Sequence, residues 1–415
     1  MKPKLLIKKT FFISAILFFA LFTSCKDEIL ETVTYKTQIR YLTSPDSIRA
    51  IEVAAQSPKT LENPGRIYIY GNYLFINDVR KGIHVVDNSN PASPVFLNFI
   101  NIPGNQDLAV NDNILYADSY IDLLAFDISN PKQIKIKNRV KDVFNSYYRA
   151  VNTNLIYAYK DTLITYTHKK GSSRNKDAFI TTSFNSSSDS RSYGTGGSTA
   201  RFTLQNSSLY TVDQTQLKVF NVENAASPAF VKNINIGFGI ETIFPYQNKL
   251  FVGSTTGMHI FDASDPLSPV KLSTYSHVTS CDPVIVEGDY AYVTLRSGTN
   301  CRQGINVLEV INIKDPKNPK LISQFNMINP RGLAIKDNIL FICEGAIGFK
   351  TFDKSNILTV GEKLLSFNKA INSNDVIAGP KSIIITGDDS IYQYSYPVSE
   401  APSKLLSQIK KAPTF

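Results

Sequence analysis

Cysteine is the first residue type in this chain that could do chemistry. It occurs four times, at Cys25, Cys281, Cys301 and Cys343. No two cysteines form a C-x-x-C pair, so their spacing does not favour a metal site. Cys281 and Cys301 fall in two loops that we place on the same face of one repeat, and a disulfide persists in an exported protein. We therefore expect a Cys281–Cys301 disulfide, with Cys343 as a small buried residue of a strand.

Histidine and the common catalytic motifs point to no reaction. The four histidines, at positions 84, 168, 259 and 277, are scattered, and His84 and His259 occupy equivalent positions of a repeat. The sequence contains no glycine-rich phosphate loop and no G-x-S-x-G nucleophile motif. We therefore name no catalytic residue, no metal ligand and no cofactor.

A third set consists of charged residues that recur at one position of a repeat. Each lies within about one residue of the start of a short apolar strand. The set contains four cations and four anions: Arg66, Asp107, Arg149, Arg201, Glu241, Asp282, Arg331 and Asp375. If these strands surround a common axis, the side chains form a ring that could bind a polar ligand in an axial pocket. The alternative is that the charges pair with one another or are solvated at the strand ends.

A repeated segment supplies the strands that position these residues. Residues 82–96, GIHVVDNSNPASPVF, return in modified form at 123–131, 258–269, 310–319 and 349–356. The alternating apolar run predicts a strand, Asp or Asn closes it, and proline sets the turn that follows. The closing residues recur about every 40 positions, at 87, 127, 167, 221, 262, 312, 353 and 395.

A period near 40 residues with about four short strands per unit is typical of β-propeller blades. In the second repeat we expect strands at 95–100, 107–110, 114–117 and 123–127. We predict an all-β fold: one propeller of about eight four-stranded blades, or seven if the degenerate third or fourth unit does not form. By analogy with other propellers, the strand next to the charged residue is innermost. The chain has no Trp, so it lacks the tryptophan-bearing signatures of WD-type, quinone-binding and sialidase propellers.

Two repeats are longer than the others, and their extra residues fall at 185–198 and 297–304. In a meandering blade both positions emerge on one face, whereas the tight hairpins and the Asp/Pro turns cover the opposite face. Loops carry function more often than regular turns do. This insertion face is therefore the candidate working surface.

The N-terminus predicts export and lipid attachment. Four lysines precede an apolar run from Phe11 to Phe22 that is too short for a comfortable membrane span. Residues 21–25, LFTSC, resemble a bacterial lipobox. We expect residues 1–24 to be a lipoprotein signal peptide and Cys25 to be lipidated; the alternative is an ordinary signal peptide followed by an incidental cysteine.

The residues after Cys25 concern the cellular address. Residues 26–28, KDE, resemble the lysine-plus-acid signal that directs some lipoproteins to the outer face of the outer membrane. We expect an outer-membrane lipoprotein that is exposed at the cell surface. The alternative orientation faces the periplasm.

The other boundaries follow from local patterns. Residues 25–60 form a polar lead-in, in which Ser44-Pro45-Asp46 predicts the start of a short helix, with a strand as the alternative. The propeller is expected at 61–398 and a closing strand or tail at 399–415. Residues 403–409, SKLLSQI, are similar to the strand at 320–325. We expect this tail to pair with the chain before Gly65, so that strands from both chain ends close the ring.

The Asp-x-Ser-x-Pro-x-x-Pro turns resemble those of the LVIVD-repeat proteins, a family of secreted and lipid-anchored bacterial proteins. The resemblance is closest over residues 63–105 and 115–120 and extends over roughly 61–396. The third, fourth and eighth repeats depart from it because they lack the Asp/Pro turn. The resemblance implies a β-propeller at the cell surface, and it supplies no activity or catalytic residue.

Charge and motif content leave three classes of function open. The net charge of +9 is not concentrated in a stripe, and four of the lysines lie in residues 1–24, so nucleic-acid binding is not supported. The first class is a non-catalytic, monomeric surface scaffold that binds an unknown protein or glycan through the insertion face. The second is an enzyme or small-ligand binder that uses the axial pocket. The third is a structural component of envelope assembly.

Overall fold

The computed structural model describes residues 30–144, 148–169, 197–277, 283–297, 305–397 and 403–412. Two compact units are distinguished: one comprises Met1–Thr37, Asp161–Thr182 and Phe415, and the larger one comprises Gln38–Lys160 and Ser183–Thr414. Antiparallel strands make up nearly all of the named elements. In the described part of the chain, no helix is long and apolar enough to cross a membrane.

Within its described residues, the larger unit contains seven sheets of four or five antiparallel strands. The first sheet has the order β2-β6-β5-β4-β3, and the others each contain four consecutive strands. The first two sheets comprise β2 (Ala55–Gln56), β3 (Pro64–Tyr70), β4 (Tyr73–Asp78), β5 (Gly82–Asp87), β6 (Val95–Asn101), β7 (Leu108–Asn111), β8 (Ile114–Ser119), β9 (Asp122–Asp127) and β10 (Lys135–Val140). The third and fourth comprise β12 (Phe202–Gln205), β13 (Ser208–Val212), β14 (Gln216–Asn221), β15 (Ala229–Asn235), β16 (Ile240–Tyr246), β17 (Lys249–Ser254), β18 (Gly257–Asp262) and β19 (Val270–Ser276). The last three comprise β20 (Val284–Glu287), β21 (Tyr290–Leu295), β22 (Val307–Asn312), β23 (Lys320–Asn326), β24 (Leu333–Lys336), β25 (Ile339–Cys343), β26 (Phe349–Asp353), β27 (Leu364–Asn368), β28 (Asp375–Ala378), β29 (Ile383–Thr386), β30 (Ser390–Tyr394) and β31 (Leu405–Lys410).

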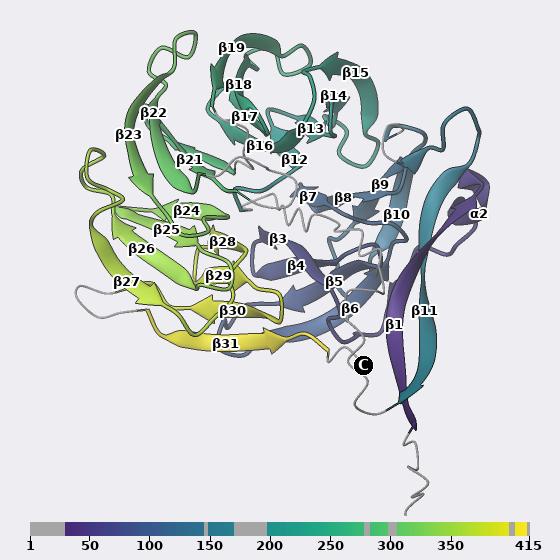
Figure 1. Cartoon of the computed structure of the whole chain (residues 1–415). Helices are drawn as coiled ribbons and strands as arrows, with labels where there is room; N and C mark the ends of the chain where they lie inside the picture. Colours follow the sequence, from purple (N-terminus) through teal and green to yellow (C-terminus); the bar gives the residue numbers. More distant parts are fainter. Residues whose placement is uncertain are drawn as a thin grey trace, which may run out of the picture. The chain divides into compact units, whose positions relative to one another are not determined.

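The strand that follows the recurring charged residue is innermost, as predicted. From β3 through β7, β12, β16, β20 and β24 to β28, each first strand contacts the first strand of the sheet that follows it in the chain. Between the last and the first sheet the contact is from β29 to β3. In Figure 1 the first strands that are labelled gather at the centre of the larger unit. The predicted repeat boundary is wrong by one strand, because the strand expected at 95–100 is β6, which is the fourth strand of the preceding sheet when counted from the innermost strand. Periodicity gives the length of the repeat but does not say which strand begins a sheet.

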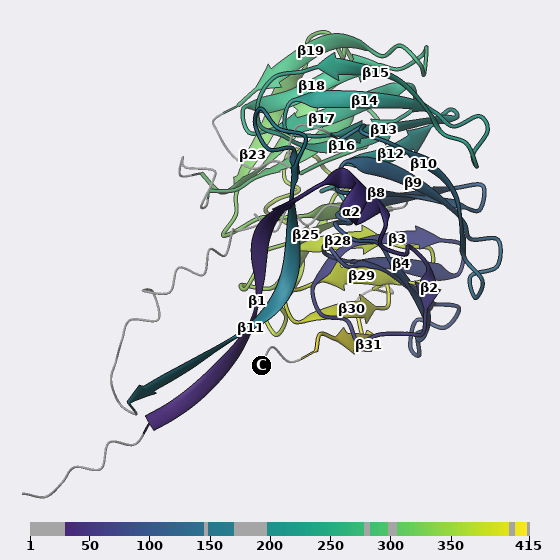
Figure 2. The ribbon, with the colours of Figure 1, turned by 90° about the vertical axis from the view of Figure 1, so that its right-hand side faces the viewer.

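In the described residues, the unit expected around residue 167 does not form a four-stranded sheet. Its strand β11 (Ile156–Lys169) pairs instead with β1 (Leu30–Thr43) in a two-stranded sheet, and Figure 2 shows the two strands side by side. Residues 161–167 alternate between exposed and half-buried, whereas β8 is buried throughout. A strand without two apolar faces cannot be packed between two neighbouring sheets. The count of eight is therefore not confirmed, and the seven sheets of the described residues match the alternative count.

The C-terminal tail forms a strand, but its partner differs from the prediction. β31 pairs with β30, with Ile409 opposite Ile391, and completes the last sheet as its outermost strand. In every sheet the fourth strand comes from the stretch of chain that follows the third strand, and in the last sheet that fourth strand is the tail. Only the first sheet has a fifth strand among the described residues, β2, which pairs with β6 and comes from the lead-in. A backbone hydrogen bond of 2.6 Å from Ala412 N to Leu61 O still links the tail to the chain before Gly65.

The lead-in contains the predicted short helix. The helix α2 (Pro45–Arg49) begins with Pro45 in its first turn, and the Ser44 hydroxyl accepts a hydrogen bond of 3.1 Å from the backbone N–H of Ser47. This cap satisfies one of the N–H groups that a helix leaves open at its start. The helix ends after one turn, and the short strand β2 follows it.

Candidate functional site

Four of the eight predicted ring residues meet near the inner strands. Arg66 in β3 and Asp107, immediately before β7, form an ion pair with 3.3 Å between Nε and Oδ2. The backbone N–H of Arg201 donates to the same Asp107 oxygen at 3.0 Å. Asp375 begins β28, and the Arg66 charge acts to lower the pKa of its carboxyl group. Arg66, Asp107 and Asp375 are buried, with exposed fractions of 3%, 1% and 3%.

Burial raises the pKa of three carboxyl groups in this cluster. The pKa of Asp107 rises to about 7, because burial outweighs the opposing effect of the Arg66 charge. Burial likewise raises the pKa of Asp375 to about 7 and that of the neighbouring Asp118 to about 6. At mildly acidic pH these groups retain protons that exposed carboxyl groups release.

A short stretch of chain, which we name the axial segment (residues 197–201), runs through this cluster. The Ser198 hydroxyl accepts a hydrogen bond of 2.8 Å from the backbone N–H of Leu333. The Thr199 hydroxyl donates to Asp375 Oδ2 at 2.7 Å. The carbonyl oxygen of Ala200 accepts from the N–H of Ile243 at 2.8 Å. Ser198, Thr199 and Ala200 are buried, with exposed fractions of at most 7%.

The axial segment leads into the sheet that begins with β12, and hydrogen bonds connect it to four other sheets. Its partners Leu333, Asp375 and Ile243 belong to β24, β28 and β16, and its Arg201 N–H reaches the residue before β7. The approach is close, because a Cβ on Gly197 would lie 1.9 Å from Asp375 Oδ2. The chain itself therefore fills the centre at this level, and the observed pairing of Arg66 with Asp107 corresponds to the alternative of internal ion pairing.

Two more ring residues, Glu241 and Arg331, belong to a separate group around Arg296. Burial lowers the pKa of Arg296, and the Arg331 charge lowers it further, whereas Glu241 opposes the shift. Arg331 donates through Nη1 to the side chain of Asn374. The ring residue Asp282 lies outside the described residues. The eight charges therefore do not form one continuous ring in the described structure.

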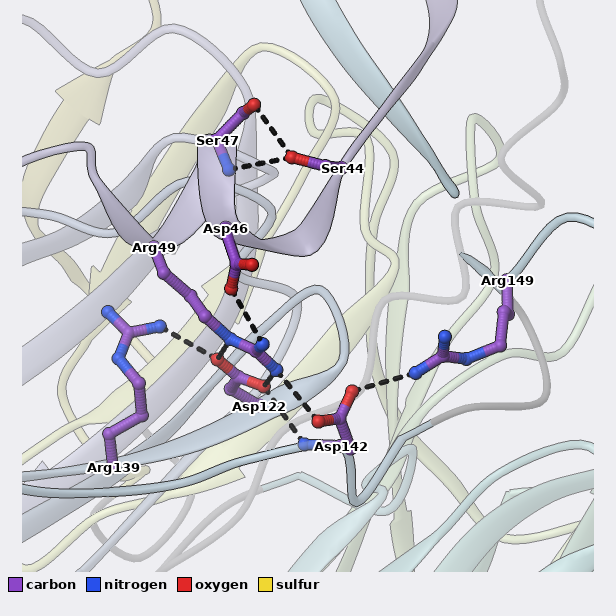
Figure 3. Close-up of polar contacts among 8 residues, drawn as sticks. All are labelled: Ser44, Asp46, Ser47, Arg49, Asp122, Arg139, Asp142 and Arg149. Atoms are coloured by element: carbon purple, nitrogen blue, oxygen red, sulfur yellow. Dashed lines mark hydrogen bonds and ion pairs between the residues drawn. The ribbon is translucent and has the colours of Figure 1, made fainter. Parts of the chain in front are cut away.

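Arg149, the remaining ring residue, belongs to a second charge cluster, shown in Figure 3. At its centre Asp122 accepts hydrogen bonds from Arg49 Nε at 2.9 Å, from Arg49 Nη2 at 2.8 Å and from Arg139 Nη1 at 2.9 Å. Burial would raise the pKa of Asp122, but the hydrogen bonds from these arginines outweigh burial and lower it. Arg149 reaches the cluster through Asp142, with 2.7 Å between Nη2 and Oδ1.

This second cluster fastens the lead-in to the second sheet. Arg49 is the last residue of α2, and Asp122 is the first residue of β9. Sequence reasoning missed the pair because 73 positions separate its members and no local motif links them. The axial segment was missed for a similar reason: Ser198 was assigned to the end of a low-complexity insertion.

The cysteines and histidines supply no clustered site in the described residues. Cys343 is unpaired and fully buried in β25, as predicted, and burial raises the pKa of its thiol. Cys281 and Cys301 lie outside the described residues, so their disulfide stays a prediction. His84 Nε2 lies 3.2 Å from Asp78 Oδ2, and burial lowers the pKa of His259 to about 4. No group of three or more metal-ligating side chains occurs in the part of the chain that the structure describes.

The repeat can be assigned by comparison with known families. Residues 64–101 and 104–142 each match the sequence profile of the LVIVD repeat. The chain contains LVIVD repeats. The first match coincides with β3 to β6 and the second encloses β7 to β10, so one LVIVD repeat corresponds to one sheet that begins with its inner strand. This agrees with the corrected boundary of the repeat.

A solved structure supports the fold of this LVIVD-repeat chain. The chain is similar to the periplasmic gluconolactonase PpgL of Pseudomonas aeruginosa, with 10% identity, a TM-score of 0.53, and coverage of 84% of this chain and 95% of the other. BamB of Moraxella catarrhalis is 8% identical, with a TM-score of 0.49 and coverage of 88% and 96%. No curated protein matches the sequence significantly. At 10% identity the similarity to PpgL concerns the β-propeller fold and carries no activity.

Proposed function

We propose that this LVIVD-repeat protein is a non-catalytic binding scaffold: a closed ring of seven blades, tethered to the outer membrane through a lipidated Cys25 and exposed at the cell surface. It holds a protein or glycan partner on the loops of its insertion face. Hydrogen bonds between the first and last sheets support the closed ring, since Asn88 Nδ2 donates to Gln393 Oε1 at 3.0 Å and Gln393 Nε2 donates back to Asn88 Oδ1 at 2.7 Å.

The observation that best supports the binding function is the exposure of the Phe238 side chain. This side chain is 83% exposed in the loop between β15 and β16, which belongs to the insertion face. The glycines on either side, Gly237 and Gly239, have φ angles of +132° and +77°, a backbone region that favours glycine. A hydrogen bond of 2.8 Å from Thr255 N to Gly239 O ties the loop to the next one on the same face. An exposed aromatic side chain on a braced loop suits a contact with a protein or a sugar ring.

The burial of the charged residues near the inner strands favours a binding function over a catalytic one. Arg66, Asp107 and Asp375, which an axial enzyme would need at its pocket, are buried, and the axial segment covers the carboxylates. General acid–base catalysis requires a group within hydrogen-bonding reach of the substrate. In this arrangement the groups with shifted pKa values are occupied by the protein's own chain.

The binding function is tested with Phe238→Ala. We expect a partner of the unaltered protein, found on a glycan array or among solubilised envelope proteins, to bind the variant at least about ten-fold more weakly, because an aromatic anchor contributes on this scale. Leu358→Ala is the matched control, since Leu358 is 60% exposed in the turn after β26, on the opposite face. Equal affinity of the Phe238 variant and the unaltered protein, or binding of no glycan and no protein, would contradict the proposal.

The anchor is tested with Cys25→Ala. The variant is expected to lose incorporation of a labelled fatty acid and to leave the membrane fraction, because the thiol is the acylated group. Cys343→Ala should keep the label, since Cys343 is buried in β25. Lipid labelling of the Cys25 variant would rule out the anchor, and full protection of the protein from protease added to intact cells would place it facing the periplasm.

A further inference from the structure

A groove of about 800 Å³ opens where the first and last sheets meet. We name it the seam groove. Its walls are residues 58–61, which follow β2, residues of the 92–96 stretch that enters β6, and residues 407–412 of β31 and its end. Figure 1 shows β31, in yellow, beside β6. A hydrogen bond of 2.6 Å from the Ser407 hydroxyl to the carbonyl oxygen of Pro91 joins the two walls.

The seam groove is cationic. Lys59, Lys410 and Lys411 line it, and no acidic residue does. None of these lysines has a carboxylate partner among the described residues. The nearby Glu62 is already paired with Lys81, with 2.5 Å between Nζ and Oε2. Lys59 Nζ lies 4.6 Å from the centre of the Phe99 ring, which holds this ammonium group in place.

Lys410 is a departure from the repeat. It lies opposite Ser390, the first residue of the third strand of its sheet. In four other sheets the residue at this position of the fourth strand is an asparagine: Asn101, Asn235, Asn326 and Asn368. The positive charge is therefore a property of the seam and not of the blade in general.

The remaining lining residues indicate which kind of anion the seam groove can bind. Leu61 and Ile409, the large aliphatic side chains of the lining, are only 2% and 8% exposed and offer little surface to an acyl chain. An added peptide strand would need a free edge of β31, but this edge is already bridged to the first sheet at Ser407 and by the bond from Ala412 N to Leu61 O. Thr60 supplies a hydroxyl group, and Gln408 supplies its amide oxygen, because its Nε2 already donates to the Ser390 hydroxyl at 2.8 Å. The half-buried Phe96 supplies an apolar face.

We propose that the seam groove binds an acidic saccharide. Lys59 and Lys410 contact its carboxylate or sulfate groups, and Thr60 and Gln408 contact its hydroxyl groups. A sugar ring combines hydroxyl groups with an apolar C–H face, which matches the mixed lining. The inference rests on the binding function proposed above, but it places a ligand at the outer rim of the propeller and not on the insertion face.

The test measures binding of a short oligogalacturonate by calorimetry to the unaltered protein and to Lys59→Gln and Lys410→Gln. Each substitution is expected to weaken binding about ten-fold, and affinity should fall as salt is raised. Lys320→Gln is the matched control, because Lys320 is an exposed lysine of the equivalent outer strand β23 in another sheet. Chondroitin sulfate in place of oligogalacturonate distinguishes a sulfate ligand from a carboxylate ligand.

Three outcomes would overturn the proposal: no binding of either acidic saccharide, equal binding of a neutral maltooligosaccharide, or loss of affinity in Lys320→Gln as large as that in Lys410→Gln. Tighter binding of poly-glutamate than of the saccharides would assign the groove to acidic peptides and overturn it as well. The Phe238→Ala variant should bind oligogalacturonate normally, so a failure of the seam site and a failure of the insertion-face function give different results.

Discussion

Deletion of residues 403–415 is expected to lower the free energy of unfolding by about 3–6 kcal/mol. The deletion removes β31, and with it the backbone pairing with β30 and the buried side chain of Ile409. Loss of the apolar burial contributes about 1.5–3 kcal/mol, and each lost hydrogen bond about 1 kcal/mol. Exposure of β30 as a new edge should also promote aggregation. Urea unfolding of purified truncated and full-length protein measures the change.

Two point variants separate the strand from its side chains. Leu405→Ala alters a residue of β31 that is 52% exposed and should leave stability nearly unchanged. Ile409→Ala keeps the strand but removes a buried side chain, so its effect should lie between those of Leu405→Ala and the deletion. A truncated protein as stable as the full-length chain would show that β31 does not contribute to the last sheet in solution.

Asp375→Asn is expected to become more stable relative to the unaltered protein as the pH rises from about 5 to about 8. Burial raises the pKa of Asp375 to about 7, from 3.8 for an ordinary aspartate. Between these values the folded protein retains a proton that the unfolded chain has lost, so stability falls as the pH rises through this range. Asparagine cannot ionise and escapes this loss. The relative gain should be on the order of 2 kcal/mol.

The variant and the unaltered protein are compared at the same pH. This cancels the contribution to stability of the groups that both proteins contain, such as His259. Asp127→Asn is the matched control: hydrogen bonds from Ser129 lower the pKa of Asp127 to about 2, so the group is ionised in folded and unfolded chains throughout this pH range. Its stability difference should therefore stay constant. A constant difference for Asp375→Asn too would mean that Asp375 is not buried in its neutral form beneath the axial segment.

The sequence could reveal features that depend on neighbours along the chain. The 40-residue period with alternating apolar residues led to the β-propeller, and the LVIVD matches at 64–101 and 104–142 agree with it. Ser44 and Pro45 predicted α2, because a helix cap involves residues three positions apart. The buried position of Cys343 in a strand also followed from its local pattern.

Only the tertiary structure decided which distant segments pair. The strand β11 has the alternation of a propeller strand but lacks a second apolar face, and its pairing with β1 replaces the expected third blade. The contacts of Thr199 with Asp375 and of Arg49 with Asp122 join residues 176 and 73 positions apart. Local alternation and turn residues determine strands and their spacing, whereas partners are chosen by the burial and charge complementarity of surfaces that form only when the sheets assemble.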